Sequence, residues 1–171
     1  MNNKDKVLQI IFKNPTTNFH IRELARLIKL NPNTIINIIK KLSKENLLKL
    51  EKKKHITEIS ANIENKKFVE KKRISNLNQL YNSGLIEFLI KEFNPELISV
   101  IGSYSKGEDI EKSDIDIVII TEKEKSLNVA KFEKIMSRKI HLIITNYKKM
   151  SEEFYTNLIN GIIVHGYLNK K

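Results

Sequence analysis

The sequence predicts an α+β fold, in which a helical N-terminal part with a short β-hairpin precedes a mixed sheet with flanking helices. Two patterns in the sequence carry this prediction. Apolar residues recur at helical spacing through residues 4–13, 21–28 and 32–45, whereas residues 97–101 and 115–120 are apolar runs of the length of a strand. A chain of 171 residues is long enough for two small domains of this kind.

The N-terminal part begins with three predicted helices. Residues 4–13 and 21–28 each place their apolar side chains on one helical face. Asn31 and Pro32 then suit the N-cap and the first turn of a third helix. The polar face of this third helix carries Asn33, Thr34, Asn37, Lys40, Lys41 and Lys44. Two short helices joined by a tight turn, the second with a polar outer face, are typical of a helix-turn-helix.

A β-hairpin is predicted at residues 48–59. Leu48 and Leu50 alternate with charged residues, and residues 56–59 are β-prone. The tip of the hairpin is basic and consists of Lys52, Lys53, Lys54 and His55. Residues 1–60 hold 13 basic and 5 acidic residues, so they carry +8 of the chain's formal charge of +11. Localised positive charge attracts polyanions, and we therefore expect double-stranded DNA as a partner.

With "HIRELARLIKLNPNTIINIIKKLSKENLL", residues 4–60 resemble the winged helix-turn-helix family. The resemblance implies a DNA-binding domain at residues 1–62, with Pro32–Glu45 as its recognition helix and Lys52–His55 as its wing. Asparagine and lysine side chains can read base edges, while the wing lysines and His55 can contact phosphates. The competing interpretation is a winged helix that serves protein contacts only.

Residues 63–83 predict a helical linker. Its apolar residues have the spacing of an amphipathic helix, and they are Phe68, Ile74, Leu77, Leu80 and Tyr81. Gly84 interrupts the pattern, and a second helix continues to Phe93. The apolar stripe of the linker is also compatible with a homodimer.

The stretch "VIGSYSKGEDIEKSDIDIVII", residues 100–120, carries the chemistry. Asp114 and Asp116 interrupt an apolar run, and on one strand they would lie on the same face. Buried carboxylates need compensation, which divalent cations provide. Upstream, Gly102 lets a ligand approach the backbone, and Ser103 is expected to cap a short helix whose first amides bind phosphate.

The same stretch resembles the DNA-polymerase-β-like nucleotidyltransferases, in particular the minimal nucleotidyltransferases, over roughly Leu85 to Leu168. The signature is Gly-Ser, ten intervening residues and then Asp-Ile-Asp. The resemblance implies a minimal nucleotidyltransferase domain at residues 84–171 that binds a nucleoside triphosphate (NTP). Gly102 and Ser103 would bind its phosphates, and Asp114 and Asp116 would be catalytic ligands of Mg²⁺. The expected nucleotide contacts also include Gly107, Ser113 and Tyr104, whose ring would either stack on the nucleotide or pack internally.

The sequence departs from this family at the third strand. The family's third carboxylate falls in "RKIHLIITN", residues 138–146, where His141 takes its place and no Asp or Glu lies between Lys134 and Ser151. Mg²⁺ prefers oxygen ligands, so the catalytic ion should bind weakly. Alternatively, His141 is a general base or recruits a softer metal such as Mn²⁺.

Two functions follow from these observations. The first is a DNA-bound enzyme that transfers a nucleotide from NTP to a partner protein or to an RNA acceptor. The second is a transcriptional regulator or antitoxin-like protein whose nucleotidyltransferase domain is weak or inactive and serves as a nucleotide sensor or docking module. Minimal nucleotidyltransferases resemble antitoxins that pair with a HEPN-domain toxin, so a HEPN-type partner fits either function. The chain has no cysteine and no long apolar run, so we expect a cytoplasmic protein without a membrane segment.

Overall fold

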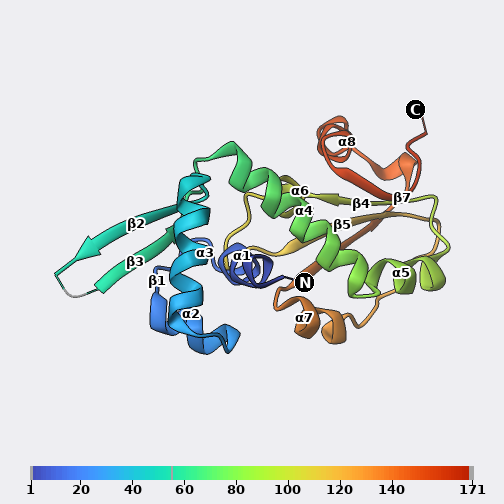
Figure 1. Ribbon diagram of the computed structural model, residues 1–171. Coiled ribbons are helices and arrows are strands. Elements are labelled where there is room, and N and C mark those ends of the chain that lie inside the picture. Colours follow the sequence, from blue (N-terminus) through green and yellow to red (C-terminus); the bar gives the residue numbers. More distant parts are fainter. Residues whose placement is uncertain (1, 55, 170–171) are drawn as a thin grey trace. The chain divides into compact units, whose positions relative to one another are not determined.

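The computed structural model describes residues 2–54 and 56–169. The chain forms two compact units, Met1–Lys72 and Arg73–Lys171. The predicted α+β class is confirmed, since one unit combines helices with an antiparallel sheet and the other combines helices with a mixed sheet (Figure 1). No helix among the described residues is long and apolar enough to cross a membrane.

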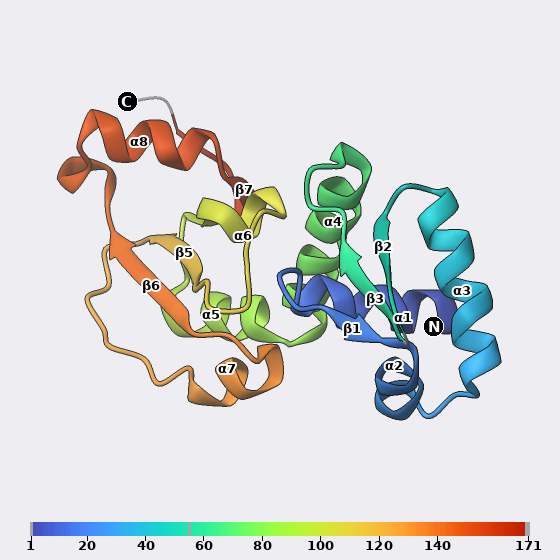
Figure 2. The same ribbon diagram turned by 90° about the vertical axis from the view of Figure 1, so that its left-hand side faces the viewer.

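The described residues of the first unit form three complete helices, the start of a fourth and a three-stranded antiparallel sheet of order β1-β3-β2. Its elements are α1 (Asn3–Lys13), β1 (Phe19–His20), α2 (Ile21–Ile28), α3 (Pro32–Lys44), β2 (Leu48–Lys53) and β3 (Ile56–Ala61). These bounds confirm the three predicted helices and the hairpin. Figure 2 shows the short strand β1 beside β3, where Phe19 pairs with Ile59.

Helix α3 forms as its capping residues predict. Asn31 accepts a hydrogen bond from the backbone N–H of Asn33 at 2.8 Å, and Pro32 occupies the first helical position. The apolar face buries Ile35, Ile39 and Leu42 in the core of the unit. The opposite face of α3 is therefore left for solvent or a partner.

Helix α4 (Lys66–Asn82) supplies side chains to two cores. Near its start, Phe68 is buried in the core of the first unit, with its ring centroid 5.1 Å from that of Phe12. Near its end, Leu80 is buried in the core of the second unit. Gly84 then interrupts the helix in a left-handed conformation, and α5 (Leu85–Phe93) follows.

The second unit is built on a four-stranded sheet of order β6-β5-β4-β7. Its strands are β4 (Leu97–Ile101), β5 (Ile115–Ile120), β6 (Ile140–Thr145) and β7 (Ile162–Gly166). β5 and β6 are parallel, while β4 is antiparallel to both of its neighbours, so the sheet is mixed as predicted. α5 and α7 (Ala130–Met136) cover one face, and α8 (Glu152–Ile159) covers the other (Figure 2).

One helix of this unit has no counterpart in the sequence-based interpretation. This helix, α7, lies in the crossover that a parallel β5–β6 pair requires. The following helix, α8, begins only at Glu152. Asn146 caps a separate 3₁₀ turn at Tyr147–Lys149, and Ser151 then caps α8 by accepting a hydrogen bond from Phe154 N–H.

Candidate functional site

Three strands bring the candidate residues to one edge of the second sheet. In the central strand β5, Asp116 pairs with Ile101, the last residue of β4, on one side. On its other side Asp116 pairs with His141 of β6. In the sheet, His141 therefore lies directly beside Asp116.

Gly102 lies against the Asp116 carboxylate. Its φ is +70°, a left-handed conformation that favours glycine. A Cβ atom at this position would stand 2.9 Å from Asp116 Oδ2, which is closer than such contacts normally come. The glycine thus keeps the carboxylate and the start of α6 (Gly102–Lys106) close together.

The burial expected for the two aspartates is wrong. β5 begins at Ile115, so Asp114 precedes the strand and is exposed to solvent. The Asp116 side chain is 33 % exposed. Both carboxylates lie at the start of β5, where water solvates them, and the apolar residues of the strand are buried beyond them. Their charge therefore needs no buried counter-ion.

Ser103 does not cap α6, in contrast to the expectation. Ile101 occupies the N-cap position, without a side-chain hydrogen bond, and Ser103 lies inside the first turn. The helix ends at Lys106, because Gly107 adopts a left-handed φ of +79° and terminates it. The expected helical continuation through Glu108–Glu111 is instead a loop.

The remaining predicted nucleotide contacts have structural roles in this conformation. Ser113 Oγ accepts a hydrogen bond from Ile110 N–H at 2.9 Å and so closes a turn just before Asp114. Tyr104 is buried, and its hydroxyl donates to the backbone carbonyl of Asn76 at 3.1 Å. Burial and the nearby Asp109 charge raise the pKa of the Tyr104 phenol. Of the two alternatives for the Tyr104 ring, the structure shows internal packing.

His141 contacts Asp116 directly. Asp116 Oδ1 accepts a hydrogen bond from His141 Nδ1 at 3.1 Å, which assigns a hydrogen to Nδ1. The imidazole is 63 % exposed, so a ligand at this edge of the sheet could reach it.

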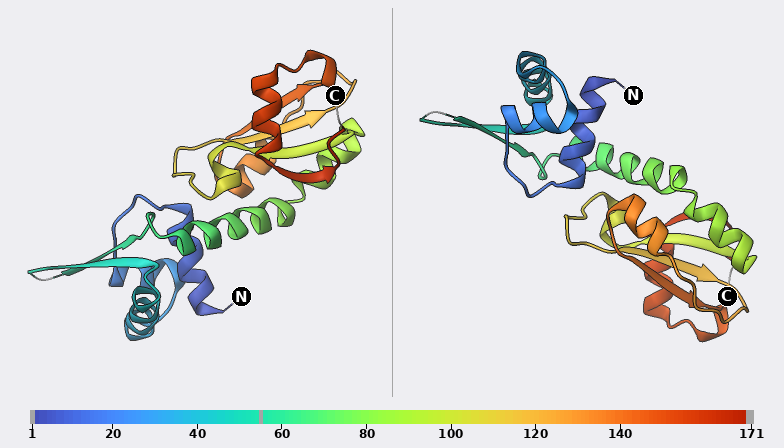
Figure 3. Two further views of the ribbon diagram at one scale, coloured as in Figure 1. Left: turned by 90° about the horizontal axis from the view of Figure 1, so that it is seen from above. Right: turned by 90° about the horizontal axis from the view of Figure 1, so that it is seen from below.

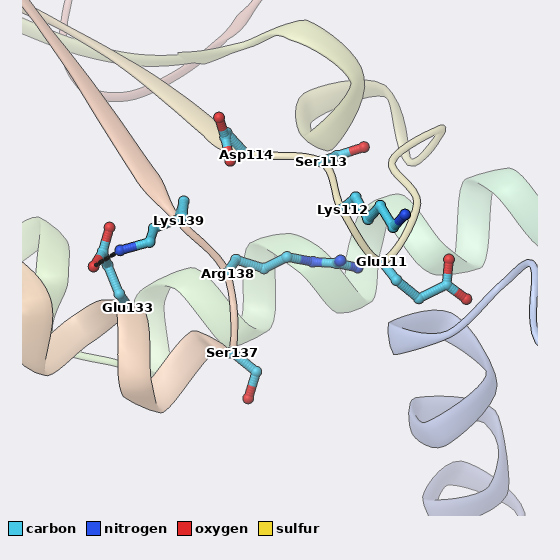
Figure 4. Close-up of a pocket in the computed structure, with 8 residues that line it drawn as sticks. All are labelled: Glu111, Lys112, Ser113, Asp114, Glu133, Ser137, Arg138 and Lys139. Atoms are coloured by element: carbon cyan, nitrogen blue, oxygen red, sulfur yellow. Dashed lines mark hydrogen bonds and ion pairs between the residues drawn. The ribbon is translucent and has the colours of Figure 1, made fainter.

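A pocket of about 330 Å³ lies beside Asp114. It is lined by the loops that lead into β5 and β6, at residues 111–114 and 137–139, and by Glu133 of α7. In Figure 4, Lys139 is paired with Glu133, and Arg138 extends toward the loop that carries Ser113. The Lys139 ammonium and the Ile140 N–H both bind the Glu133 carboxylate and lower its pKa, the backbone N–H being the larger cause.

Residues 83–167 match the sequence model of the family described as polymerase beta, nucleotidyltransferase. These residues form a polymerase-β-like nucleotidyltransferase domain. The family typically uses a divalent metal ion and an NTP, and nucleotidyl transfer is the activity that the domain suggests. No curated protein matches the chain.

The nucleotidyltransferase domain fits one divalent ion better than two. Asp114 and Asp116 are oxygen donors at an exposed edge, which suits Mg²⁺ that arrives with a triphosphate. Among residues 2–54 and 56–169, no group of three or more histidine, cysteine or acidic side chains is arranged to hold a metal ion. His141, which pairs with Asp116 in the sheet, offers a nitrogen donor, whereas Mg²⁺ prefers oxygen ligands.

Sequence reasoning missed a buried polar cluster in the nucleotidyltransferase domain. Asp109 is buried and binds both Asn76 of α4 and Arg138. No spacing rule singles out these residues, because they come from three separate segments. A charged residue inside a loop was their only signal.

The residues predicted to bind DNA are accessible. On α3, Asn33, Asn37, Lys40, Lys41 and Lys44 are exposed and Thr34 is half-buried. Lys52, Lys53 and Lys54 are exposed on the hairpin, while His55 lies outside the described residues. Lys53 forms an ion pair with Glu58 at 2.8 Å, which raises the pKa of the lysine.

Proposed function

We propose that the nucleotidyltransferase domain binds NTP with Mg²⁺ and transfers a nucleotide to an acceptor on another macromolecule. The observation that carries this proposal is the close approach of the Asp116 carboxylate to Gly102. A side chain at this position would collide with the carboxylate and move it. α6 begins at the same place, so its first backbone amides and two carboxylates share one edge of the sheet.

Each residue has a distinct task in this proposal. The amides of Gly102 and Ser103 orient the triphosphate, and Asp114 and Asp116 hold its Mg²⁺. The bound ion would supply charge neutralisation at the phosphates. His141 holds Asp116 through its Nδ1 hydrogen and thereby orients the carboxylate. The pocket beside Asp114 offers space for the acceptor, either a protein hydroxyl or the end of an RNA.

A thermal-shift measurement tests nucleotide binding. A ligand that binds only the folded state stabilises it by about 2.7 kcal/mol when its free concentration is 100 times Kd. NTP with Mg²⁺ should therefore raise the melting temperature by several degrees, and Asp114→Asn with Asp116→Asn should abolish the shift. The matched control, Glu152→Gln with Glu153→Gln, removes two exposed carboxylates from α8 and should keep it. No shift in the unaltered protein at millimolar NTP would refute the proposal.

We propose further that the first unit binds double-stranded DNA as a winged helix-turn-helix. This proposal is supported by the element order, with α2 and α3 followed by the β2–β3 hairpin, and by the concentration of charge in residues 1–60. α3 would enter the major groove, and the lysines of the hairpin would contact phosphates.

The second candidate function is a regulator with little catalysis. The specific observation in its favour is His141, which occupies the third-strand position and already binds Asp116. In this case NTP is a signal, and the domain docks a partner such as a HEPN-type protein. Incubation with labelled NTP and candidate acceptors distinguishes the two functions. Label on an acceptor supports transfer, whereas nucleotide binding without label under Mg²⁺ and Mn²⁺ supports the regulator.

A further inference from the structure

Four residues of the second unit form a buried polar cluster, which we call the Asp109 network: Asn76, Tyr104, Asp109 and Arg138. Asp109 Oδ1 accepts a hydrogen bond from Asn76 Nδ2 at 2.7 Å, and Asp109 Oδ2 accepts one from Arg138 Nη2 at 3.2 Å. The Asp109 side chain is 1 % exposed and that of Arg138 is 7 % exposed. A charge pair so deeply buried is weak evidence for a stabilising role, because apolar replacements are often as stable.

The Asp109 network fastens the loop that carries Asp114. Residues 107–114 contain no helix or strand, and Asp109 is the buried residue near their middle. Through Asn76 it ties this loop to α4, and the same amide also donates to the carbonyl of Tyr104 in α6 at 3.0 Å.

The network also fastens the entry to β6. Arg138 stands three residues before His141 and, in Figure 4, extends from that entry toward the loop. Ile115 N–H donates to the carbonyl of Lys139, the residue after Arg138, at 2.8 Å, so the two segments are joined at a second point. The Asp109 network therefore links the loop that carries Asp114, the start of β5 with Asp116 and the start of β6 with His141.

We propose that Asp109 and Arg138 are positioning residues for the nucleotidyltransferase site. They set the Asp114 loop and the His141 end of β6 at a fixed separation and touch neither nucleotide nor metal themselves. The inference rests on the proposed function, because it assigns the network to the metal and nucleotide site of that function. Preorganisation of this kind matters because metal ligands held by their neighbours bind more tightly than ligands that must be ordered on binding.

The test uses a double variant that removes both charges of the Asp109–Arg138 pair. Asp109→Asn with Arg138→Met does so at similar volume, whereas either change alone would leave one charge of this pair without the other. Arg138→Lys keeps the positive charge and shortens its reach, so partial retention is expected. The matched control is Lys125→Met, which breaks an ion pair with Glu92 in the same domain. Lys125 follows the end of β5, whereas Asp114 precedes its start.

Amide hydrogen exchange in the full chain without ligand provides the first readout. The N–H groups of Ile110, Ser113 and Ile115 are hydrogen-bonded in or next to the loop. In the double variant their exchange should accelerate by at least about tenfold, equivalent to about 1.4 kcal/mol, while exchange in the strands stays slow. Lys125→Met should leave these three amides unchanged. Unchanged exchange in a folded double variant would overturn the inference.

Titration with Mn²⁺ alone and with MgATP provides the second readout. Loss of groups that orient metal ligands weakens metal affinity by about 10- to 100-fold, so the double variant should lose about tenfold or more, and Arg138→Lys should lose less. If the unaltered protein binds Mn²⁺ or MgATP and the folded double variant binds it with the same affinity, this inference is overturned and the proposed function is not. An unaltered protein that binds neither probe overturns the proposed function, and the inference falls with it.

Discussion

At the scale of single residues, His141 bears on how many metal ions the site can bind. Its Nδ1 hydrogen binds Asp116, and we propose that its ring takes the place of the third carboxylate that would complete a two-ion site. An imidazole there orients one metal ligand but adds no oxygen donor, so the binding of one nucleotide-borne ion and the binding of a second ion become separable properties.

Replacement of His141 by aspartate should restore the second ion. We expect His141→Asp to tighten Mn²⁺ binding by about tenfold, or about 1.4 kcal/mol, because added ligand charge raises affinity for hard cations. Transfer of labelled nucleotide to an acceptor should rise as well. His141→Asn is the control, since it has the size of aspartate without the charge. A lower transfer rate in His141→Asp than in the unaltered protein would instead favour histidine as a working base.

Glu133 makes the stability of the second unit depend on pH. Hydrogen bonds from Ile140 N–H and Lys139 hold its pKa below the ordinary value of 4.5 in the folded state. A lowered folded-state pKa stabilises the protein above the unfolded-state value, and this contribution is lost as pH falls through the folded-state pKa. Glu133→Gln should therefore lower the melting temperature at neutral pH and make little difference well below 4.5. Melting curves at several pH values measure this, and an equal difference at all pH values would contradict it.

At the scale of elements, the junction of β4 and α6 depends on Gly102. Gly102→Ala places a Cβ atom 2.9 Å from Asp116 Oδ2 and also strains a residue whose φ is +70°. Gly84 offers a matched control, because its φ is +76° and a Cβ atom there meets nothing within 4 Å. Both alanine variants should be destabilised by about 1–2 kcal/mol, because alanine is strained in a left-handed backbone conformation. Only Gly102→Ala should also lose the melting shift with MgATP, and equal shifts in both would contradict a role for this close approach.

The exposed face of α3 should govern DNA affinity. Reversal of Lys40, Lys41 and Lys44 to glutamate should weaken duplex binding strongly and make the slope of log affinity against log salt shallower by up to about 3, one for each lost phosphate contact. The matched control reverses three exposed lysines of the second unit, Lys131, Lys134 and Lys148, and so changes the net charge equally. Fluorescence anisotropy at several salt concentrations measures both variants. Equal losses would show that net charge alone, without α3, determines binding.

The elements that sequence reasoning predicted well are those with a strong local pattern. α3 has its N-cap, its proline and a regular apolar stripe, and its predicted start at Pro32 is confirmed. α6 was harder, because its end depends on the left-handed Gly107 and its start has no capping side chain to signal it. α7 was missed because the local pattern of residues 130–136 is short, and only the parallel pairing of β5 with β6 requires a crossover there.

Sequence motifs predicted the part of the candidate site whose residues have a characteristic spacing along the chain. Gly102, Asp114 and Asp116 carried a spacing signal, and the register of β6 pairs His141 with Asp116. The exposure of Asp114 depends on where β5 begins, which is the least reliable part of any sequence-based assignment. The Asp109 network joins residues 29 positions apart through burial, and burial of a loop aspartate is a property of the folded state alone.

At the scale of the whole molecule, α4 belongs to both units, because Phe68 is buried in one core and Leu80 in the other. A gene that ended before Phe68 would encode a first unit whose Phe12 has lost its aromatic neighbour, and one that began after Leu80 would open the core of the second unit. Recombination that exchanged either half for an unrelated domain would have to carry most of the helix with it. The two halves should consequently be inherited as a pair, with the sequence of α4 changing more slowly than its exposed lysines would lead one to expect.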